Sequence, residues 1–240
     1  MIPKIIFQTH EYEYSDIPKY MLELSKSWIK LNPGYEYRYF SAKQREEYIK
    51  NKCPEIMFFY NNCSGMYQAD IWRYFILYEN GGVYADMDSI CIMSLDNLIK
   101  EKYYNQDLIA TTPSDQHDWI GTTNMGKQEP TPYLSNNANF ACKKESNIIK
   151  TLIDDIVLHN NNNIKKEDWY GIGPITYSKH VLKNKNKVLF EMQDVAFHDR
   201  NNNNDSINKE LERYNVAMNK LNDASFTVNY LGKDVLYKNI

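Results

Sequence analysis

The stretch that decides the fold reads Gly81-Gly82-Val83-Tyr84-Ala85-Asp86-Met87-Asp88. Residues 65–79 before it carry apolar side chains at helical spacing, and neither Gly nor Pro interrupts them after Gly65. The glycine pair is expected to end this helix, because Gly adopts the left-handed conformation that closes a helix at little cost. Residues 83–85 then predict a short buried strand. Two acidic residues, Asp86 and Asp88, therefore follow directly at the end of a strand.

Two carboxylates one residue apart repel each other and lose hydration if they are partly buried. A divalent cation removes this repulsion, and oxygen ligands suit Mg²⁺ or Mn²⁺. Because Mg²⁺ sites usually combine one or two carboxylates with substrate phosphates, the pair predicts a site for a metal-bound phosphate. An isolated Asp-x-Asp is more often a pair of solvated acidic residues in a turn. The neighbouring residues therefore have to decide between a metal site and such a turn.

A second charged pair, Asp70 and Arg73, lies three positions apart on the predicted helix. This spacing places the carboxylate and the guanidinium on one helix face, close enough to form an ion pair. On the surface such a pair would contribute only about 0–1 kcal/mol to stability. In the functional interpretation, Asp70 accepts hydrogen bonds from sugar hydroxyls, and Arg73 supports it or reaches an anion.

The composition of the chain limits its class. Its 240 residues suffice for one sizeable core, and 42% hydrophobic and 25% charged residues are ordinary for a globular protein. A formal net charge of −3 argues against a protein that binds nucleic acid by charge alone. We see neither an apolar run long enough to span a bilayer nor a signal-peptide segment. We therefore expect one domain, no nucleic-acid partner, no transmembrane segment and a cytoplasmic location.

The cysteines agree with that location. The chain contains four of them, and none is in a Cys-x-x-Cys spacing, which argues against metal or redox use. We expect reduced, mostly buried thiols at Cys53, Cys63, Cys91 and Cys142.

Strands and helices alternate in the first part of the sequence. This order is typical of parallel strands with crossover helices, an architecture that binds nucleotides. Residues 54–62 read as an aromatic-rich connector, and Pro174 is expected at or near the first turn of a helix. The other predicted elements are strands at 3–9, 35–40, 107–111, 188–192, 195–198 and 226–231, and helices at 17–31, 42–52, 95–104 and 146–159.

The stretch 69–88 also carries a family resemblance. It reads Ala-Asp-x-x-Arg-Tyr-x-x-Leu-Tyr-x-x-Gly-Gly-Val-Tyr-x-Asp-x-Asp, which resembles the signature of the family 32 glycosyltransferases. That family includes yeast-type mannosyltransferases and bacterial capsular sugar transferases, and the signature is also similar to the glucosyltransferase domains of clostridial toxins. The first strand is similar too, with Phe7 where a His is usual and His10 where a Trp is usual. Residues 171–174 resemble the family's Thr-Gly-Pro, with Ile172 in place of the Thr.

The resemblance implies an α/β, GT-A-like single domain over residues 1–240, with a Rossmann-type mixed sheet flanked by helices. Residues 1–111 would form the nucleotide-sugar-binding half and residues 112–240 the acceptor-side half. The implied enzyme is a hexosyltransferase that depends on Mn²⁺ or Mg²⁺ and retains the anomeric configuration. Its donor would be a nucleotide-diphosphate sugar, a UDP-hexose first and GDP-mannose second. Its acceptor would be a glycan or another hydroxyl compound, as in polysaccharide biosynthesis.

Carried over residue by residue, the resemblance assigns catalytic roles to Asp70, Arg73, Asp86, Asp88 and Asn137. Asp86 and Asp88 would hold the metal, although Asp86 could instead bind the ribose hydroxyls. Asp70, Arg73 and Asn137 would orient the donor sugar. Further donor contacts are expected at the end of the first strand, beside the Asp-x-Asp pair and near the C-terminus, at Gln8, Thr9, His10, Gly82, Tyr84, Asn136 and Lys233.

Two aspartates leave a six-coordinate metal site incomplete, and a third protein ligand is common. In the resembling family this ligand comes from near the C-terminus, where Asn229 corresponds to the usual His. His198 is the rival candidate, and in a third interpretation neither residue binds the metal.

Two other function classes compete with a transferase. A silent nucleotide-sugar or glycan binder would use the same residues without turnover. There is also a resemblance to the nucleophile motif of haloacid-dehalogenase-type phosphatases, in the segment Asp86-Met87-Asp88-Ser89-Ile90. Those motifs usually follow an N-terminal strand, however, and the later Lys and acidic-pair motifs of that class are not evident here.

Overall fold

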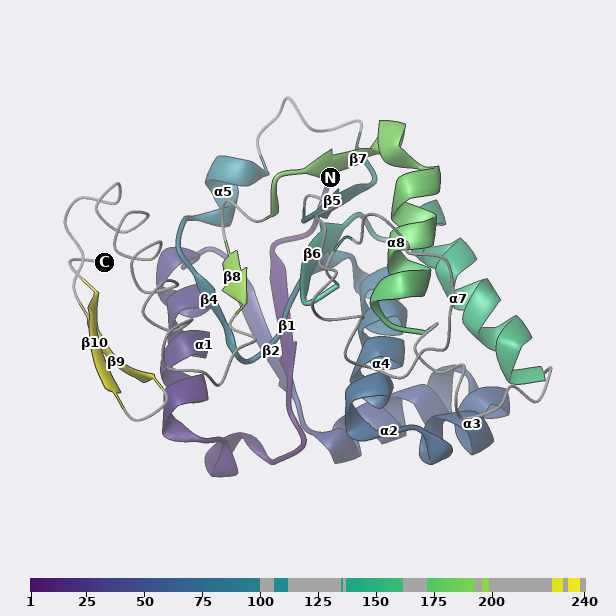
Figure 1. Cartoon of the computed structure of the whole chain (residues 1–240), viewed down its shortest axis with the longest axis horizontal. Helices are drawn as coiled ribbons and strands as arrows, with labels where there is room; N and C mark the ends of the chain where they lie inside the picture. Colours follow the sequence, from purple (N-terminus) through teal and green to yellow (C-terminus); the bar gives the residue numbers. More distant parts are fainter. Residues whose placement is uncertain are drawn as a thin grey trace, which may run out of the picture.

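A six-stranded mixed sheet forms the centre of the protein (Figure 1). The structure is a computed structural model that describes residues 1–99, 106–111, 135, 137–161, 172–192, 196–198, 226–230 and 233–237. The strand order is β2 (Glu36–Phe40), β1 (Ile5–Thr9), β3 (Gly82–Ala85), β6 (Asn139–Cys142), β5 (Leu108–Ala110) and β7 (Val188–Phe190).

Most of this sheet is parallel. β2, β1 and β3 run in the same direction, and β5 and β7 are parallel to each other, whereas β6 is antiparallel to both of its neighbours. Strands from both predicted halves of the chain therefore share one sheet. The predicted α/β class, a mixed sheet flanked by helices, is confirmed.

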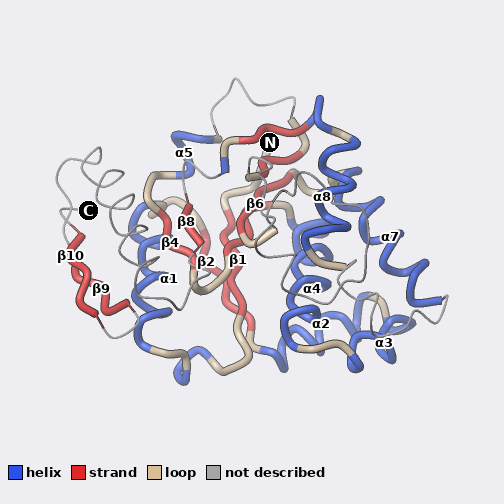
Figure 2. The backbone as a smooth tube through the Cα atoms, in the orientation of Figure 1, coloured by secondary structure: helices blue, strands red, loops and turns tan. Residues whose placement is uncertain are grey.

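Helices cover both faces of the sheet (Figure 2). α1 and α5 lie on one side, and α4, α2, α7 and α8 lie on the other. The helices are α1 (Lys19–Leu31), α2 (Ala42–Lys52), α3 (Met57–Asn62), α4 (Gly65–Asn80), α5 (Leu95–Leu98), α7 (Asn147–Asn161) and α8 (Pro174–Lys183).

The alternation of side chains along the strands divides the core into two clusters. Ile6 and Val83 face α1, where they pack with Trp28. Phe7 and Tyr84, one position further along each strand, face α4 and pack with Trp72. Successive residues of a strand point to opposite faces, so each short strand supplies both layers of the core.

Short pairings lie outside the central sheet. β4 (Ser89–Cys91) pairs antiparallel with β8 (Ala196–His198), and β9 (Phe226–Tyr230) pairs antiparallel with β10 (Lys233–Tyr237). The sequence predicted β8 and β9 but not β10. α1 contacts both β4 and β9 (Figure 1).

Two other predictions need correction. Residues 54–62, read as a connector, form a 3-10 turn at Pro54–Ile56 and then α3, because Pro54 occupies a first-turn position where its missing N–H costs nothing. The helix predicted at 95–104 extends only over Leu95–Leu98 among the residues described up to 99. Farther along, Pro174 begins α8, as predicted.

The glycine pair ends α4 as predicted. Gly81 is its C-cap with φ 67°, and Gly82 follows with φ 105°. A Cβ on Gly81 would lie 2.5 Å from the backbone nitrogen of Lys144, and one on Gly82 would lie 2.7 Å from the backbone oxygen of Ile5. Both positions thus require glycine, for conformation and for space.

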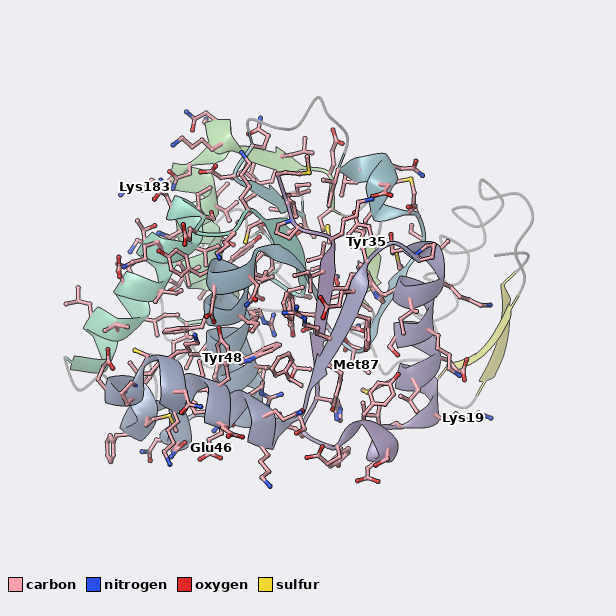
Figure 3. All side chains as sticks on the ribbon, turned by 180° about the vertical axis from the view of Figure 1, so that it is seen from behind. Lys19, Tyr35, Glu46, Tyr48, Met87 and Lys183 are labelled. Carbon is pink, nitrogen blue, oxygen red and sulfur yellow. The ribbon has the colours of Figure 1, made fainter. Side chains whose placement is uncertain are left out.

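Side-chain contacts hold α2 against α4. The hydroxyl of Tyr48, which Figure 3 labels on α2, donates a hydrogen bond to Glu79 of α4, and Lys52 forms an ion pair with the same carboxylate. All four cysteines are free and buried, as expected. In the part of the chain that the structure describes, no helix combines the length and apolar character that crossing a membrane requires.

Candidate active site

The ion pair predicted between Asp70 and Arg73 on α4 forms, and it is buried. Nη2 of Arg73 lies 3.2 Å from Oδ1 of Asp70, and each residue is only 4% exposed. The interpretation as a surface ion pair is therefore wrong. A buried charge is stable only when it is paired and hydrogen-bonded, so the surroundings of Arg73 have to neutralise it.

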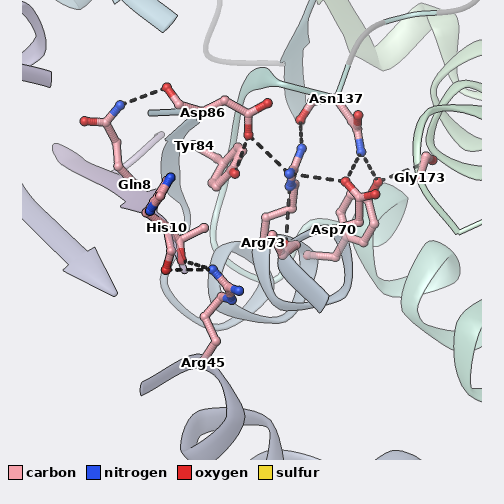
Figure 4. A network of polar contacts seen from close by, with 12 residues as sticks. Gln8, His10, Arg45, Asp70, Arg73, Tyr84, Asp86, Asn137 and Gly173 are labelled. Atoms are coloured by element: carbon pink, nitrogen blue, oxygen red, sulfur yellow. Dashed lines mark hydrogen bonds and ion pairs between the residues drawn. The ribbon is translucent and has the colours of Figure 1, made fainter. Parts of the chain in front are cut away.

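Arg73 lies at the centre of a network that joins three chain segments (Figure 4). Its Nη2 is also 3.2 Å from Oδ1 of Asp86, which follows β3. Its Nη1 donates a hydrogen bond of 2.6 Å to the backbone oxygen of Asn137, just before β6. Its guanidinium carbon lies 4.2 Å from the centre of the Tyr84 ring, a cation–π contact.

Asn137 closes the network on the side of Asp70. Its Nδ2 donates to Oδ1 of Asp70 and to the hydroxyl oxygen of Tyr74, both at 2.8 Å. Burial raises the pKa of Asp70 to about 6, with Arg73 opposing the shift, Asp86 adding to it and Asn137 opposing it. Asp70, Arg73 and Asn137, predicted separately as sugar-orienting residues, thus form one buried unit.

Gly173, immediately before α8, approaches Asp70 from the other side (Figure 4). A Cβ at this position would lie 2.8 Å from Oδ2 of Asp70. Gly173 therefore leaves room for the second carboxylate oxygen. Its backbone oxygen also accepts a long hydrogen bond of 3.5 Å from the Tyr74 hydroxyl.

The main chain and the side chain of Asp86 are both held. Its Oδ1 accepts a hydrogen bond of 2.5 Å from the Tyr84 hydroxyl. Its backbone oxygen accepts from Nε2 of Gln8 at 3.0 Å, and its backbone nitrogen donates to the oxygen of Ala138 at 2.9 Å. Gln8 of β1 and Ala138, the residue just before β6, thereby fix the start of the Asp-x-Asp turn from both sides.

Asp88 is half-buried at the end of the same turn. The turn holds together through a hydrogen bond of 3.0 Å from the backbone nitrogen of Ser89 to the oxygen of Asp86. Burial lowers the pKa of His10, while the charges of Glu11 and, more weakly, Asp88 oppose the shift. The register of β1 against β3, with Phe7 opposite Tyr84, places His10 beside this turn.

The donor set fits a divalent cation only in part. No group of three or more His, Cys, Asp or Glu side chains among the described residues is arranged to hold a metal. Asp86 and Asp88 supply two carboxylates, which suit Mg²⁺ or Mn²⁺ when phosphate oxygens complete the coordination. These two residues would therefore hold the cation together with a phosphorylated ligand.

The two candidates for a third ligand lie on different strands. The antiparallel register of β4 and β8 places His198 opposite Ser89, the residue after Asp88. Asn229 lies on β9, opposite Asp234 of β10. This hairpin lies beyond α1 in Figure 1, and α1 contacts both β9 and β4. The backbone register thus brings His198, rather than Asn229, beside the Asp-x-Asp turn.

The predicted donor contacts on β1 have partners inside the protein. Gln8 is fully buried, and its Oε1 accepts a hydrogen bond of 2.9 Å from Tyr37 while its Nε2 holds Asp86. The Thr9 hydroxyl donates to the oxygen of Phe40 at 2.6 Å. His10 is half-buried, with its ring centre 5.0 Å from that of Tyr12.

The remaining predicted contacts are dispersed. Gly82 and Tyr84 are buried in β3. Lys233 begins β10, on the hairpin beyond α1. Asn136 lies outside the described residues.

Sequence reasoning missed Arg45, Tyr74 and Gly173. Arg45 lies on a highly charged helix, where a single arginine carries no signal of burial. Tyr74 follows Arg73 inside the quoted pattern, so the pattern itself marked it. Gly173 belongs to the segment 171–174, whose sequence gives no sign that this glycine would lie against Asp70.

Comparison with known proteins agrees with this geometry. Residues 18–105 match the family model described as "Glycosyltransferase sugar-binding region containing DXD motif", and the match includes α4, β3 and the Asp-x-Asp turn. This stretch of the chain is thus similar to the sugar-binding region of DXD-containing glycosyltransferases. The predicted resemblance to the family 32 glycosyltransferases is thereby confirmed.

Two fungal proteins illustrate the relationship. The chain is 35% identical over 134 residues to "Inositol phosphoceramide mannosyltransferase 3" of Schizosaccharomyces pombe, covering 55% of this chain and 35% of the relative. It is 38% identical over 100 residues to "Mannosyl phosphorylinositol ceramide synthase SUR1" of Saccharomyces cerevisiae, covering 41% of this chain and 26% of the relative. The chain thus spans about a third or less of the length of these glycosyltransferase relatives.

Solved structures share the fold. "PaToxG Glycosyltransferase" superposes with a TM-score of 0.54 at 15% identity, covering 90% of this chain and 76% of the other. The ligand-free glycosyltransferase domain from the YGT toxin gives a TM-score of 0.50 at 9% identity, covering 94% of this chain and 91% of that domain. At these identities the likeness concerns the fold alone, and it confirms the predicted GT-A class.

Proposed function

We propose that the chain is a metal-dependent, retaining glycosyltransferase that moves a hexose from a nucleotide-diphosphate sugar to a glycan or other hydroxyl acceptor. One observation carries the proposal. The buried Asp70–Arg73–Asn137 unit lies directly behind the Asp-x-Asp turn, at the carboxyl end of β3. In open α/β sheets, ligands bind outside the carboxyl ends of the strands.

The barrier to transfer is the charge that builds up on the departing diphosphate. A bound Mn²⁺ or Mg²⁺ would stabilise this charge as a Lewis acid. Asp88 and Asp86 would hold the cation. Arg73 and the Tyr84 hydroxyl both engage Oδ1 of Asp86, so its carboxylate orientation is set before any ligand arrives.

Retention is implied by the family resemblance, and the environment of Asp70 favours a same-face route over a double displacement through this residue. A double displacement requires an accessible carboxylate as nucleophile, whereas Asp70 is 4% exposed and its Oδ1 is engaged by Arg73 and Asn137. In the same-face route an oxygen of the leaving phosphate takes the proton of the acceptor hydroxyl. Asp70 then has an orienting role rather than a covalent one.

The names of the relatives bear on the donor. Both fungal proteins are named for mannosyl transfer to an inositol phosphoceramide. These names support testing GDP-mannose, already the second donor implied by the resemblance, beside the UDP-hexoses. Glycans and inositol-bearing lipid headgroups are the corresponding acceptors to be tested, since both offer ring hydroxyls.

The first test is the thermal stability of the chain with a panel of nucleotide sugars, with and without Mn²⁺. A ligand that binds only the folded state stabilises it by about 2.7 kcal/mol at a hundredfold excess over Kd. We expect one nucleotide sugar to raise Tm only when metal is present, and Asp88→Ala to abolish the shift. Release of the nucleoside diphosphate in the presence of acceptor sugars then measures turnover.

Three results would contradict the proposal. Binding without turnover across a broad acceptor panel would indicate a silent binder. Mg²⁺-dependent hydrolysis of phosphate monoesters, without any shift by nucleotide sugars, would indicate a phosphatase with Asp86 as nucleophile. A shift that does not need metal would remove the metal dependence from the proposal.

A further inference from the structure

A buried arginine on α2 holds the loop that follows β1. Arg45 is 1% exposed, and its Nη1 donates to the Thr9 hydroxyl at 2.6 Å and to the backbone oxygen of His10 at 3.2 Å. Its Nη2 lies 2.5 Å from Oε1 of Glu11. Figure 4 shows the Arg45 guanidinium beside His10, on the side of the network away from Asp70. One side chain thus contacts the last residue of β1 and the first two residues of the loop.

Glu11 connects Arg45 to the start of α4. A Cβ on Gly65, the first residue of α4, would lie 2.6 Å from the Glu11 carboxylate. The N-cap residue Ser64 makes no side-chain capping bond, so the carboxylate occupies a place where the helix favours negative charge. α4 is the helix that carries Asp70 and Arg73.

The opposite charges of Arg45 and Glu11 favour one conformation of the loop. Arg45 is buried whereas the Glu11 side chain is 49% exposed, so removing the Glu11 carboxylate would leave a buried guanidinium without the acid at ion-pair distance from it. The loop conformation that keeps Glu11 against Arg45 is therefore strongly favoured. Farther along the loop, the Ser41 hydroxyl donates a hydrogen bond of 2.9 Å to Oε1 of Glu13.

The loop held in this way borders the Asp-x-Asp turn. β1 and β3 are adjacent and parallel, with Phe7 opposite Tyr84, so His10 leaves the sheet beside the turn that holds Asp88. A ligand bound at the carboxyl end of β3 has to contact this loop.

We propose that Arg45 is a positioning residue for donor binding, which acts through Glu11 to fix the loop that presents His10 beside the Asp-x-Asp turn. This inference rests on the proposed glycosyltransferase function. It assigns Arg45, Glu11 and Gly65 to one unit that sets affinity for the nucleotide part of the donor. The transfer step itself depends on Asp70, Arg73 and the Asp-x-Asp turn.

The test compares Arg45→Met, Arg45→Lys and Glu11→Gln with the wild-type chain. Arg38→Met is the matched control, because Arg38 lies on neighbouring β2 and pairs with exposed Glu36. Binding of UDP and GDP with Mn²⁺ is measured by calorimetry, and kcat and KM for the donor by nucleotide release. Glu11→Gln changes a half-exposed carboxylate, so it keeps the test decisive if Arg45→Met fails to fold.

We expect Arg45→Met and Glu11→Gln to raise the nucleotide Kd and the donor KM about tenfold, since each breaks a charge-assisted pair. We expect kcat to stay within about twofold, because the lost interaction is made equally in the ground and transition states. Arg45→Lys should bind the nucleotide more tightly than Arg45→Met but less tightly than the wild type. Lysine keeps the positive charge but lacks the planar guanidinium that contacts several acceptors at once. Combining Arg45→Met with Glu11→Gln should cost no more than Arg45→Met alone, because the two act as one unit.

Amide hydrogen exchange supplies a readout that does not depend on donor binding. In Arg45→Met we expect faster exchange at residues 10–13 and unchanged exchange in α4 beyond its first turn. Unchanged exchange at residues 10–13 would overturn the inference. So would an unchanged Kd in Arg45→Met, or a fall in kcat at constant KM. If the wild-type chain binds neither nucleotide, the proposed function fails with the inference, whereas normal wild-type binding with unaffected variants refutes the inference alone.

Discussion

Replacing Arg73 by Met tests whether one buried cation holds the site together. Met has a similar length and no charge, so it fills most of the space and leaves little cavity. It leaves the carboxylates of Asp70 and Asp86, each 3.2 Å from the lost nitrogen, without their counter-charge. It also removes the hydrogen bond to the backbone oxygen of Asn137 and the cation–π contact with Tyr84.

The expected loss is large because the pair is buried. Removing one partner of a buried ion pair costs about 3–5 kcal/mol, and contributions within one network do not simply add. We therefore expect the free energy of unfolding to fall by about 4 kcal/mol, which lowers Tm by roughly 8–16 °C for a chain of this size.

Urea unfolding at pH 7, followed by circular dichroism, measures the change. Lys52→Met is the control, because its ion pair with Glu79 is nearly half exposed and contributes at most about 1 kcal/mol. Arg73→Lys should lie between Arg73→Met and the wild type, because it keeps the charge without the planar fork. If Arg73→Met loses no more stability than Lys52→Met, Arg73 is not the counter-charge of the site.

Three further predictions concern single residues. Relative to Asp70→Asn, the wild type should lose roughly 3 kcal/mol of stability as the pH rises from about 3 to about 7, because burial raises the pKa of Asp70 to about 6 and the unfolded chain releases its proton first. Urea melts across this range that keep a constant difference would refute the pKa shift. Gly173→Ala should lower kcat/KM for the donor about tenfold or more, because its Cβ would displace Oδ2 of Asp70; kinetics equal to the wild type would contradict that placement. Gly81→Ala should lower the free energy of unfolding by about 1–3 kcal/mol in denaturant melts. Gly34→Ala is the control and should be nearly neutral, because no atom lies within 4 Å of its Cβ. Equal losses of stability in the two variants would refute the role of the positive φ and close packing at Gly81.

Local signals predicted most of the first half of the fold. Helical spacing followed by the glycine pair identified α4, its end and β3, because both features depend on residues close in sequence. The antiparallel direction of β6 was not predictable in this way. It depends on pairing with β3 across a long separation, and a short apolar strand carries no mark of its direction.

The site was predictable where spacing decides contact. Asp70 and Arg73 meet because residues three apart share a helix face. The sequence does not show that Gln8 turns both of its polar atoms inward, since an amide at a strand end serves a ligand or a neighbour equally well. Arg45 was missed because charged residues are usually exposed, and only the folded loop shows that its partners bury it.

The buried network also bears on how the chain is made. Arg73 finds its carbonyl partner 64 residues later in the sequence, and Tyr74 reaches Gly173 across 99 residues. A growing chain on the ribosome can therefore form α4 well before the groups that close the network around its buried charges have been synthesised. Contacts between residues this far apart in the sequence form late, because closing the long intervening loop costs conformational entropy. Until then the nascent α4 holds polar groups that need water, which favours delayed, cooperative docking of the whole sheet over stepwise growth.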